Sequence, residues 1–103
     1  MSVLKVNSEE FEKEVLKAKS TVLVDFNADW CGPCRMLGPV IEELAESNKE
    51  LKVVSVNVDD NSSLAQKYGI MSIPCLILFK DGKEVKRSLG FIPKEELEDF
   101  IGE

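Results

Sequence analysis

Apolar residues along the chain alternate between two kinds of spacing, and this alternation predicts strands and helices in turn. Five short apolar runs are typical of β-strands: residues 3–6, 21–27, 53–58, 73–79 and 84–89. Between and after them, apolar residues recur at helical spacing in four segments, which begin near Asn7, Cys31, Asn61 and Pro93. The run at 21–27 is apolar on both faces, which is typical of a parallel strand covered by helices. The predicted order is β-α-β-α-β-α-β-β-α, an α/β fold with a mixed sheet between helices.

Local signals refine the ends and bends of these elements. Asn7, with Glu10 three positions later, predicts a capping box at the start of the first helix. Pro39 lies inside the second helix and lacks the amide hydrogen of one backbone bond, so a kink is expected there. The segment 80–83, Lys-Asp-Gly-Lys, predicts the tight turn of a hairpin. The predicted apolar stripe of the second helix consists of Met36, Leu37, Val40, Ile41 and Leu44.

Length and charge limit what the chain can be. Its 103 residues predict one domain over positions 1–103, large enough for one core. The net charge of -6 argues against nucleic acid, which favours a basic surface. No apolar run approaches the roughly 18 residues of a membrane span, and the first residues lack the apolar block of a signal peptide. Three cysteines, an odd number, fit a reducing compartment better than a secreted disulfide framework, so a cytoplasmic protein is expected.

The main candidate for a reactive site is the segment Trp30-Cys31-Gly32-Pro33-Cys34. The segment follows a buried strand and precedes an amphipathic helix, so Cys31 is expected at the helix N-terminus. Unpaired backbone amides and the helix dipole favour negative charge there, and the thiolate is the reactive form of cysteine. Pro33 suits the first helical turn, and Gly32 lets backbone approach a substrate closely. The resulting hypothesis is a dithiol that cycles through a Cys31–Cys34 disulfide.

Further segments along the whole chain match one known pattern: Val24-Asp25-Phe26, Trp30 to Arg35, Pro39, Asn57-Val58-Asp59, Tyr68-Gly69-Ile70, Ile73-Pro74, Phe79 to Gly82, and Gly90. A lone C-x-x-C is weak evidence. An aspartate six residues before it and an Ile-Pro pair ahead of the fourth strand make the match specific. In these residues the chain resembles the thioredoxin family. The resemblance implies the thioredoxin fold and a general protein disulfide reductase, recharged by a thioredoxin reductase.

The resemblance also implies roles for the site residues. Cys31, expected nearer the surface, attacks the disulfide of a substrate protein, and Cys34, one helical turn deeper, resolves the mixed disulfide. The family's aspartate at the position of Asp25 is buried and handles the proton of the resolving cysteine, commonly through water. Burial without a counter-charge raises a carboxyl pKa, which suits a proton acceptor near neutrality. Gly32 and Pro33 tune the redox potential, and because the chain has no histidine to stabilise the thiolate further, a reductant is expected.

A substrate surface is implied around Pro74. In the family the matching proline follows a cis peptide bond and faces the disulfide, where the preceding residue can pair with an extended substrate. The resemblance places a shallow apolar groove around Cys31, formed by Trp30, Ile73, Pro74, Gly90 and Phe91. The expected partners are disulfide-containing client proteins and the reductase, with no membrane or nucleic acid, and the protein is expected to be a monomer. No cofactor is expected, and a zinc site lacks its four ligands.

Three positions depart from the usual family pattern. Asn27 stands where an aromatic residue is usual, which is expected to make the wall behind the site more polar. Ser55 stands where many members have a lysine paired with the buried aspartate, so the pKa of Asp25 is expected to be raised further. Cys75 follows Pro74, where threonine is common. It is interpreted as a small buried core residue, with a regulatory thiol as the alternative.

Two other functions stay open from the sequence. A redox-silent interaction module on the same scaffold is one, because a fold does not determine a function. An oxidant or isomerase domain is the other, although the Gly32-Pro33 pair argues against it. A purely structural disulfide would close too short a loop to stabilise the chain much.

Overall fold

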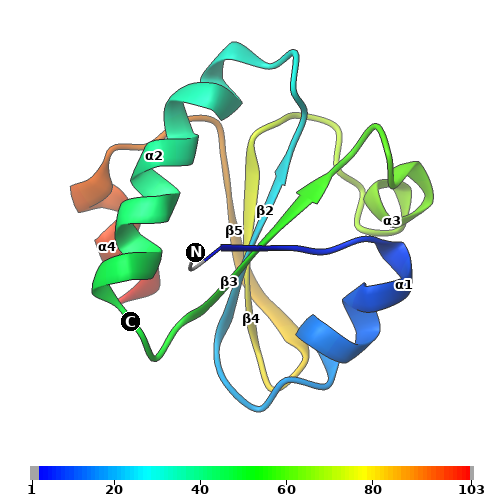
Figure 1. Cartoon of the computed structure of the whole chain (residues 1–103), viewed down its shortest axis with the longest axis horizontal. Helices are drawn as coiled ribbons and strands as arrows, with labels where there is room; N and C mark the ends of the chain where they lie inside the picture. The colour runs from blue at the N-terminus through cyan, green and yellow to red at the C-terminus, as the bar shows by residue number, and fades with distance from the viewer. Residues whose placement is uncertain (1–2, 103) are drawn as a thin grey trace.

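The computed structural model describes residues 3–102, which form a five-stranded sheet with helices on both faces (Figure 1). The elements in chain order are β1 (Val3–Lys5), α1 (Ser8–Phe11), η1 (Glu12–Leu16), β2 (Val22–Asn27), α2 (Gly32–Ser47), β3 (Lys52–Asn57), α3 (Ser62–Lys67), β4 (Cys75–Lys80), β5 (Lys83–Leu89) and α4 (Lys94–Ile101). This order confirms the predicted α/β architecture. The prediction of one domain over 1–103 includes Met1, Ser2 and Glu103, which lie outside the described residues.

The sheet has β2 at its centre. Its strand order is β1-β3-β2-β4-β5, with β2 parallel to β3 and antiparallel to β4. Residues 22–26 of β2 are all buried, which confirms the covered strand predicted from its two apolar faces. The expected parallel pairing of β2 holds for β3 but not for β4. A strand covered by helices on both faces is apolar throughout, whether its neighbours run parallel or antiparallel to it.

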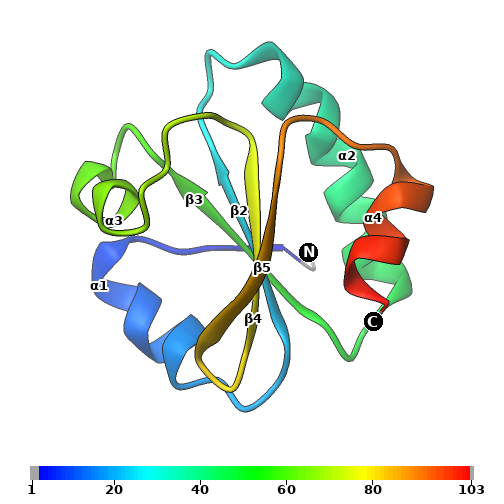
Figure 2. The same ribbon diagram turned by 180° about the vertical axis from the view of Figure 1, so that it is seen from behind.

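Helices α1 and α3 cover one face of the sheet, and α2 and α4 cover the other (Figure 2). Alternate residues of β2 therefore enter two different cores. Val22, Val24 and Phe26 pack with Phe11 of α1, whereas Leu23 packs on the opposite face. Three helical residues of that opposite core are Leu37, Ile41 and Leu97. Asp25 has the same parity as Leu23, so its carboxyl group faces α2.

The first and second helices show which local sequence signals predicted the structure and which did not. The capping box is confirmed: the Glu10 amide donates to the Asn7 side chain at 2.9 Å, and the Asn7 amide donates to the Glu10 carboxylate at 3.0 Å. The helix then widens into the π-helical segment η1. The spacing of apolar residues over these five positions does not predict a π-helix. Pro39 lies within the continuous helix α2. The inclusion of Met36 in the apolar stripe was wrong, because its side chain is 61% exposed.

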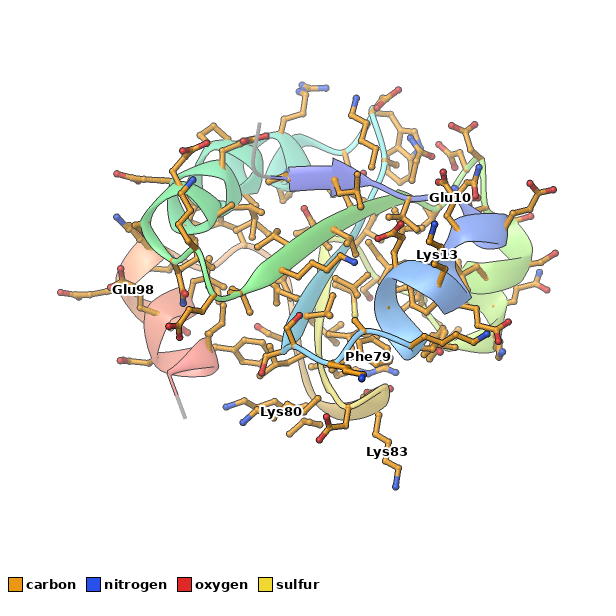
Figure 3. The ribbon with its side chains drawn as sticks, turned by 60° about the horizontal axis from the view of Figure 1, so that its bottom comes forward. Glu10, Lys13, Phe79, Lys80, Lys83 and Glu98 are labelled. Atoms are coloured by element: carbon orange, nitrogen blue, oxygen red, sulfur yellow. A yellow bond between two sulfur atoms is a disulfide. The ribbon has the colours of Figure 1, made fainter. Side chains whose placement is uncertain are left out.

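The β4–β5 hairpin is confirmed, with Lys80 and Lys83 at its end (Figure 3). Asp81 and Gly82 both have positive φ, 52° and 78°, which is typical of the turn expected between two such strands. A Cβ atom on Gly82 would meet the backbone carbonyl of Leu16. The hairpin turn therefore packs directly against the end of η1.

Candidate redox site

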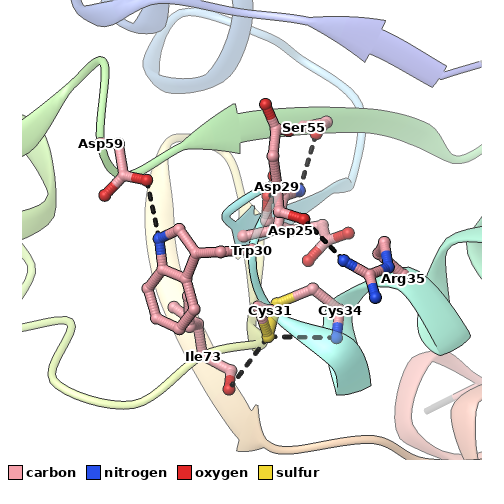
Figure 4. Close-up of a disulfide and its surroundings, with 10 residues drawn as sticks. Asp25, Asp29, Trp30, Cys31, Cys34, Arg35, Ser55, Asp59 and Ile73 are labelled. Carbon is pink, nitrogen blue, oxygen red and sulfur yellow. Dashed lines mark hydrogen bonds between the residues drawn. A yellow bond between two sulfur atoms is a disulfide. The ribbon is translucent and has the colours of Figure 1, made fainter.

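Cys31 lies where the loop after β2 meets the first turn of α2. It occupies the N-cap position with an extended backbone, φ −87° and ψ 112°, and its Sγ accepts a hydrogen bond from the Cys34 amide at 3.2 Å. The two cysteines form a disulfide with their Cα atoms 5.2 Å apart (Figure 4). Both the predicted helix N-terminus and the predicted pairing are therefore found. This amide hydrogen bond favours negative charge on the Cys31 sulfur.

The expected difference in depth between the two cysteines was wrong. Cys31 is 4% exposed and Cys34 is 6% exposed, because Ile73 and Ala28 pack against the pair. What distinguishes them is their surroundings. The Sγ atom of Cys31 lies 3.8 Å from the carbonyl oxygen of Ile73, whereas Cys34 lines a cavity of about 350 Å³ that Asp25 also lines.

Asp25 is a buried carboxyl group on the α2 side of β2. Asp25 is only 5% exposed. Among residues 3–102, its Oδ1 atom has no hydrogen-bond partner. Burial raises the pKa of Asp25 to about 6, and the neighbouring Asn27 amide offsets part of that rise. The predicted rise of the Asp25 pKa through burial is confirmed, whereas the further rise expected from Ser55 in place of a lysine stays a prediction.

The two departures beside Asp25 contact each other. The Asn27 side-chain amide donates to the Ser55 hydroxyl at 2.8 Å and to the backbone carbonyl of Asp25 at 3.2 Å. The wall behind the site is therefore polar, as predicted. The bond between Asn27 and Ser55 was not predicted, because it depends on the β2–β3 register. That register also brings a residue the sequence reading missed, Lys5, into the lining of the same cavity.

Four of the five residues predicted to bind substrate come from two short segments, 73–74 and 90–91. The Ile73–Pro74 peptide bond is cis, as predicted, and Ile73 packs against the cysteines. The Gly90 amide, in a residue with φ +87°, donates to the Pro74 carbonyl at 2.8 Å. Phe91, the next residue, is exposed at its surface.

Trp30 stands apart from the core, with 68% of its surface exposed. Its indole Nε1 donates to the Asp59 carboxylate at 2.8 Å (Figure 4). The sequence did not predict this contact between Trp30 and Asp59. This hydrogen bond to the carboxylate restrains the orientation of an exposed ring beside the disulfide.

Cys75 is fully buried and its thiol is free. It belongs to the core on the α1 and α3 face, where it is paired with Phe26 of β2. Burial raises the pKa of the Cys75 thiol, and the Arg87 charge offsets part of that rise. The interpretation as a core residue is confirmed.

Two thiols joined at a helix N-terminus, with a buried carboxyl group behind the second, define a thiol–disulfide oxidoreductase site. The family model described as "Thioredoxin" matches residues 2–103. The thioredoxin of Bacillus subtilis is 46% identical over 98% of this chain and 96% of its own length. That of Porphyra purpurea is 47% identical over 98% and 95%. Thioredoxin 1 of Synechococcus elongatus is 50% identical over 88% and 86%.

The chain belongs to the thioredoxin family. It is accordingly a protein disulfide oxidoreductase, and its redox-active pair is Cys31 and Cys34. None of the helices between residues 3 and 102 has an apolar stretch of the length that a membrane span needs.

Proposed function

We propose that the protein works as a general reductant of protein disulfides, with Cys31 as the attacking thiolate and Cys34 as the resolving thiol. One observation carries the proposal. Cys31 Sγ sits at the N-terminus of a helix of 16 residues and accepts the Cys34 amide at 3.2 Å. The amide and the helix dipole both stabilise a thiolate at that position. Cys34 lies inside the first turn and faces the cavity instead.

The reaction proceeds in two exchanges. The Cys31 thiolate attacks one sulfur of the substrate disulfide, which forms a mixed disulfide and releases the first substrate thiolate. The Cys34 thiolate then attacks Cys31 Sγ, which forms the Cys31–Cys34 disulfide and releases the second substrate thiolate. Both substrate thiolates take up a proton. Two electrons have moved from the dithiol to the substrate, and a thioredoxin reductase returns them.

Asp25 accepts the proton that Cys34 must lose before it can attack. The carboxyl group and Cys34 line one cavity, so the proton can pass between them directly or through water. A pKa of about 6 lets the carboxylate be ionised at neutral pH and still bind a proton readily. Gly32 and Pro33 carry no charge. The redox potential of the cysteine pair is therefore set mainly by the helix amides.

The substrate chain lies across Trp30, Ile73, Pro74, Gly90 and Phe91. Two contacts support this proposal: Ile73 packs on the cysteines, and the Gly90 amide donates to the Pro74 carbonyl. The partners are disulfide-containing client proteins and the reductase. The protein acts as a monomeric single domain in the cytoplasm, a proposal that its similarity to bacterial thioredoxins supports.

A redox titration of the purified protein tests the direction of the reaction. Trp30 fluorescence is followed across dithiol buffers of known potential, and acid-trapped thiols are counted as a check. The expected result is a two-electron couple at about −270 mV, the value typical of thioredoxins, assigned by mass to Cys31 and Cys34. A potential above about −200 mV would indicate an oxidant or isomerase. The absence of a reversible couple would indicate a binding module.

Single cysteine variants test the two roles. Cys34→Ser retains the attacking thiol and should accumulate a stable mixed disulfide with a disulfide-containing substrate protein. Cys31→Ser should accumulate at least about tenfold less in the same time, because Cys34 lacks the N-cap position. Non-reducing gel electrophoresis with mass spectrometry measures both. The roles are assigned wrongly if Cys31→Ser traps substrate and Cys34→Ser does not.

A further inference from the structure

Lys5, Ser55 and Asp25 form one row across three neighbouring strands. Ser55 of β3 is in register with Lys5 of β1 on one side and with Asp25 of β2 on the other. Residues in register on adjacent strands project from the same face of a sheet. All three line the cavity of about 350 Å³ that Cys34 also lines. The row therefore runs from the edge of the sheet to the carboxyl group behind the disulfide.

The middle residue of the row leaves room between its neighbours. Two strand spacings separate the backbones of Lys5 and Asp25 by roughly 10 Å. A lysine ammonium group on its four-carbon stem can cover most of that span. Ser55 is small, and its hydroxyl accepts the Asn27 amide at 2.8 Å, which holds it within the wall of the cavity.

Neither Asp25 nor Lys5, the two ends of the row, forms an ion pair among residues 3–102. The Oδ1 atom of Asp25 is buried and lacks a hydrogen-bond partner among residues 3–102. Lys5 is exposed and makes no ion pair within the same described range. A buried carboxylate is stabilised by a cation that can approach it.

The remaining charged groups near the cavity do not replace Lys5. Those that line it from the loop after β2 and from α2 are Asp29, Arg35 and Glu42. The Arg35 guanidinium donates to the backbone carbonyl of Asp29 at 3.1 Å, so it is held by the loop. An adjoining hollow of about 460 Å³ also reaches Lys5, and its acidic lining consists of Glu10, Asp29 and Asp60. β4 places Leu76 beside Asp25 and contributes no charge there.

We propose that Lys5 is a positioning residue for the thiol–disulfide reaction, whose ammonium group approaches the ionised Asp25 carboxylate across Ser55. Lys5 favours the ionised carboxylate, which is the form that accepts the Cys34 proton. The inference rests on the proposed role of Asp25 as proton acceptor. It adds a cation that enters from the edge strand, on the far side of the position where the family's usual lysine is replaced by Ser55.

An NMR titration of the Asp25 carboxyl carbon in the reduced protein measures the coupling. Lys5→Met should raise the pKa of Asp25 by roughly half a unit to one unit, because a cation is removed. Lys5→Arg should restore a value near that of the parent protein. Lys83→Met is the matched control: it removes one positive charge at the hairpin turn (Figure 3), and Lys83 does not line the cavity. It should leave the pKa of Asp25 unchanged.

Salt gives an independent readout. The difference between the parent protein and Lys5→Met should shrink in 1 M NaCl, because ions screen an exposed ammonium group. A purely structural effect of the substitution would not respond in this way. The proposal is overturned if Lys5→Met and Lys83→Met both leave the pKa of Asp25 at the parent value.

The pH profile of disulfide reduction separates the two proposals. In Lys5→Met the acidic midpoint of the profile should rise together with the pKa of Asp25. If the pKa rises and the profile stays, Lys5 contacts Asp25 without positioning it for the reaction, and the inference fails. If Asp25→Asn keeps the parent rate and profile, the proposed role of Asp25 fails, whereas a coupling seen by NMR would still stand.

Discussion

At the scale of single residues, the burial of Asp25 couples the protonation of one carboxyl group to the stability of the chain. Its pKa is about 6 in the folded protein and about 3.9 in an unfolded chain. Between these values the folded state binds more protons, so the free energy of unfolding falls as the pH rises through this range. The stability present below pH 4 is lost by about pH 7.

Asp25→Asn should remove this pH dependence. The oxidised variant is expected to exceed the parent protein in free energy of unfolding by roughly 2–3 kcal/mol at pH 7.5, because an ionised buried group is absent. At pH 4 the two proteins should differ little. Urea unfolding at the two pH values measures this. Parallel pH dependences in the two proteins would show that Asp25 titrates normally.

The same residue shows how far the sequence predicts the site. The resemblance to the family implied that Asp25 is buried, and the position of Cys31 followed from the strand and helix patterns beside it. The Asn27–Ser55 hydrogen bond and the place of Lys5 did not follow. Both depend on which residues of different strands lie in register, and a local pattern carries no information on register.

At the scale of elements, the backbone of the hairpin turn is constrained both by its φ angles and by a neighbouring segment. Gly82 combines φ +78° with close approach to the Leu16 carbonyl, whereas Gly69 has φ +65° and open space around it. Gly82→Ala should therefore lower the free energy of unfolding by roughly 2–4 kcal/mol, through both strain and a steric clash. Gly69→Ala, the matched control, should cost about 1 kcal/mol. Chemical denaturation of both variants measures the difference, and equal losses would show that the contact with Leu16 is easily relieved.

Element boundaries were predicted well where one residue type determines the backbone. The capping box at Asn7 and the turn at Asp81 and Gly82 are examples, since each has a specific backbone requirement. The π-helical segment and the exposed side of Met36 were not predicted. Apolar spacing over one or two turns is compatible with more than one helix geometry and with more than one buried face.

At the scale of the whole molecule, the sheet order assembles the site from distant parts of the sequence. The cysteines follow β2, Ile73 and Pro74 precede β4, and Lys5 ends β1. The element order and a mixed sheet could be predicted, whereas the strand order β1-β3-β2-β4-β5 came from the structure. The apolar pattern of β2 did not determine whether each neighbour is parallel or antiparallel.

Cys75 provides a probe of the whole fold. It lies in β4 between β2 and β5, with no exposed surface, so a reagent reaches its thiol only when the centre of the sheet opens. In the oxidised protein it is the one free thiol of the chain's three cysteines. A maleimide should therefore react at least roughly a thousandfold more slowly than with the unfolded chain, in line with a typical unfolding equilibrium.

The denaturant dependence decides whether this protection is global. The labelling rate should rise with urea in parallel with the unfolding equilibrium followed by Trp30 fluorescence, since both report opening of the sheet. Cys75→Ser, which should show no labelling, confirms the site of reaction. A labelling rate that is fast and independent of urea would contradict global protection. It would mean that β4 opens locally beside Pro74, and the alternative of a regulatory thiol at Cys75 would then replace its interpretation as a core residue.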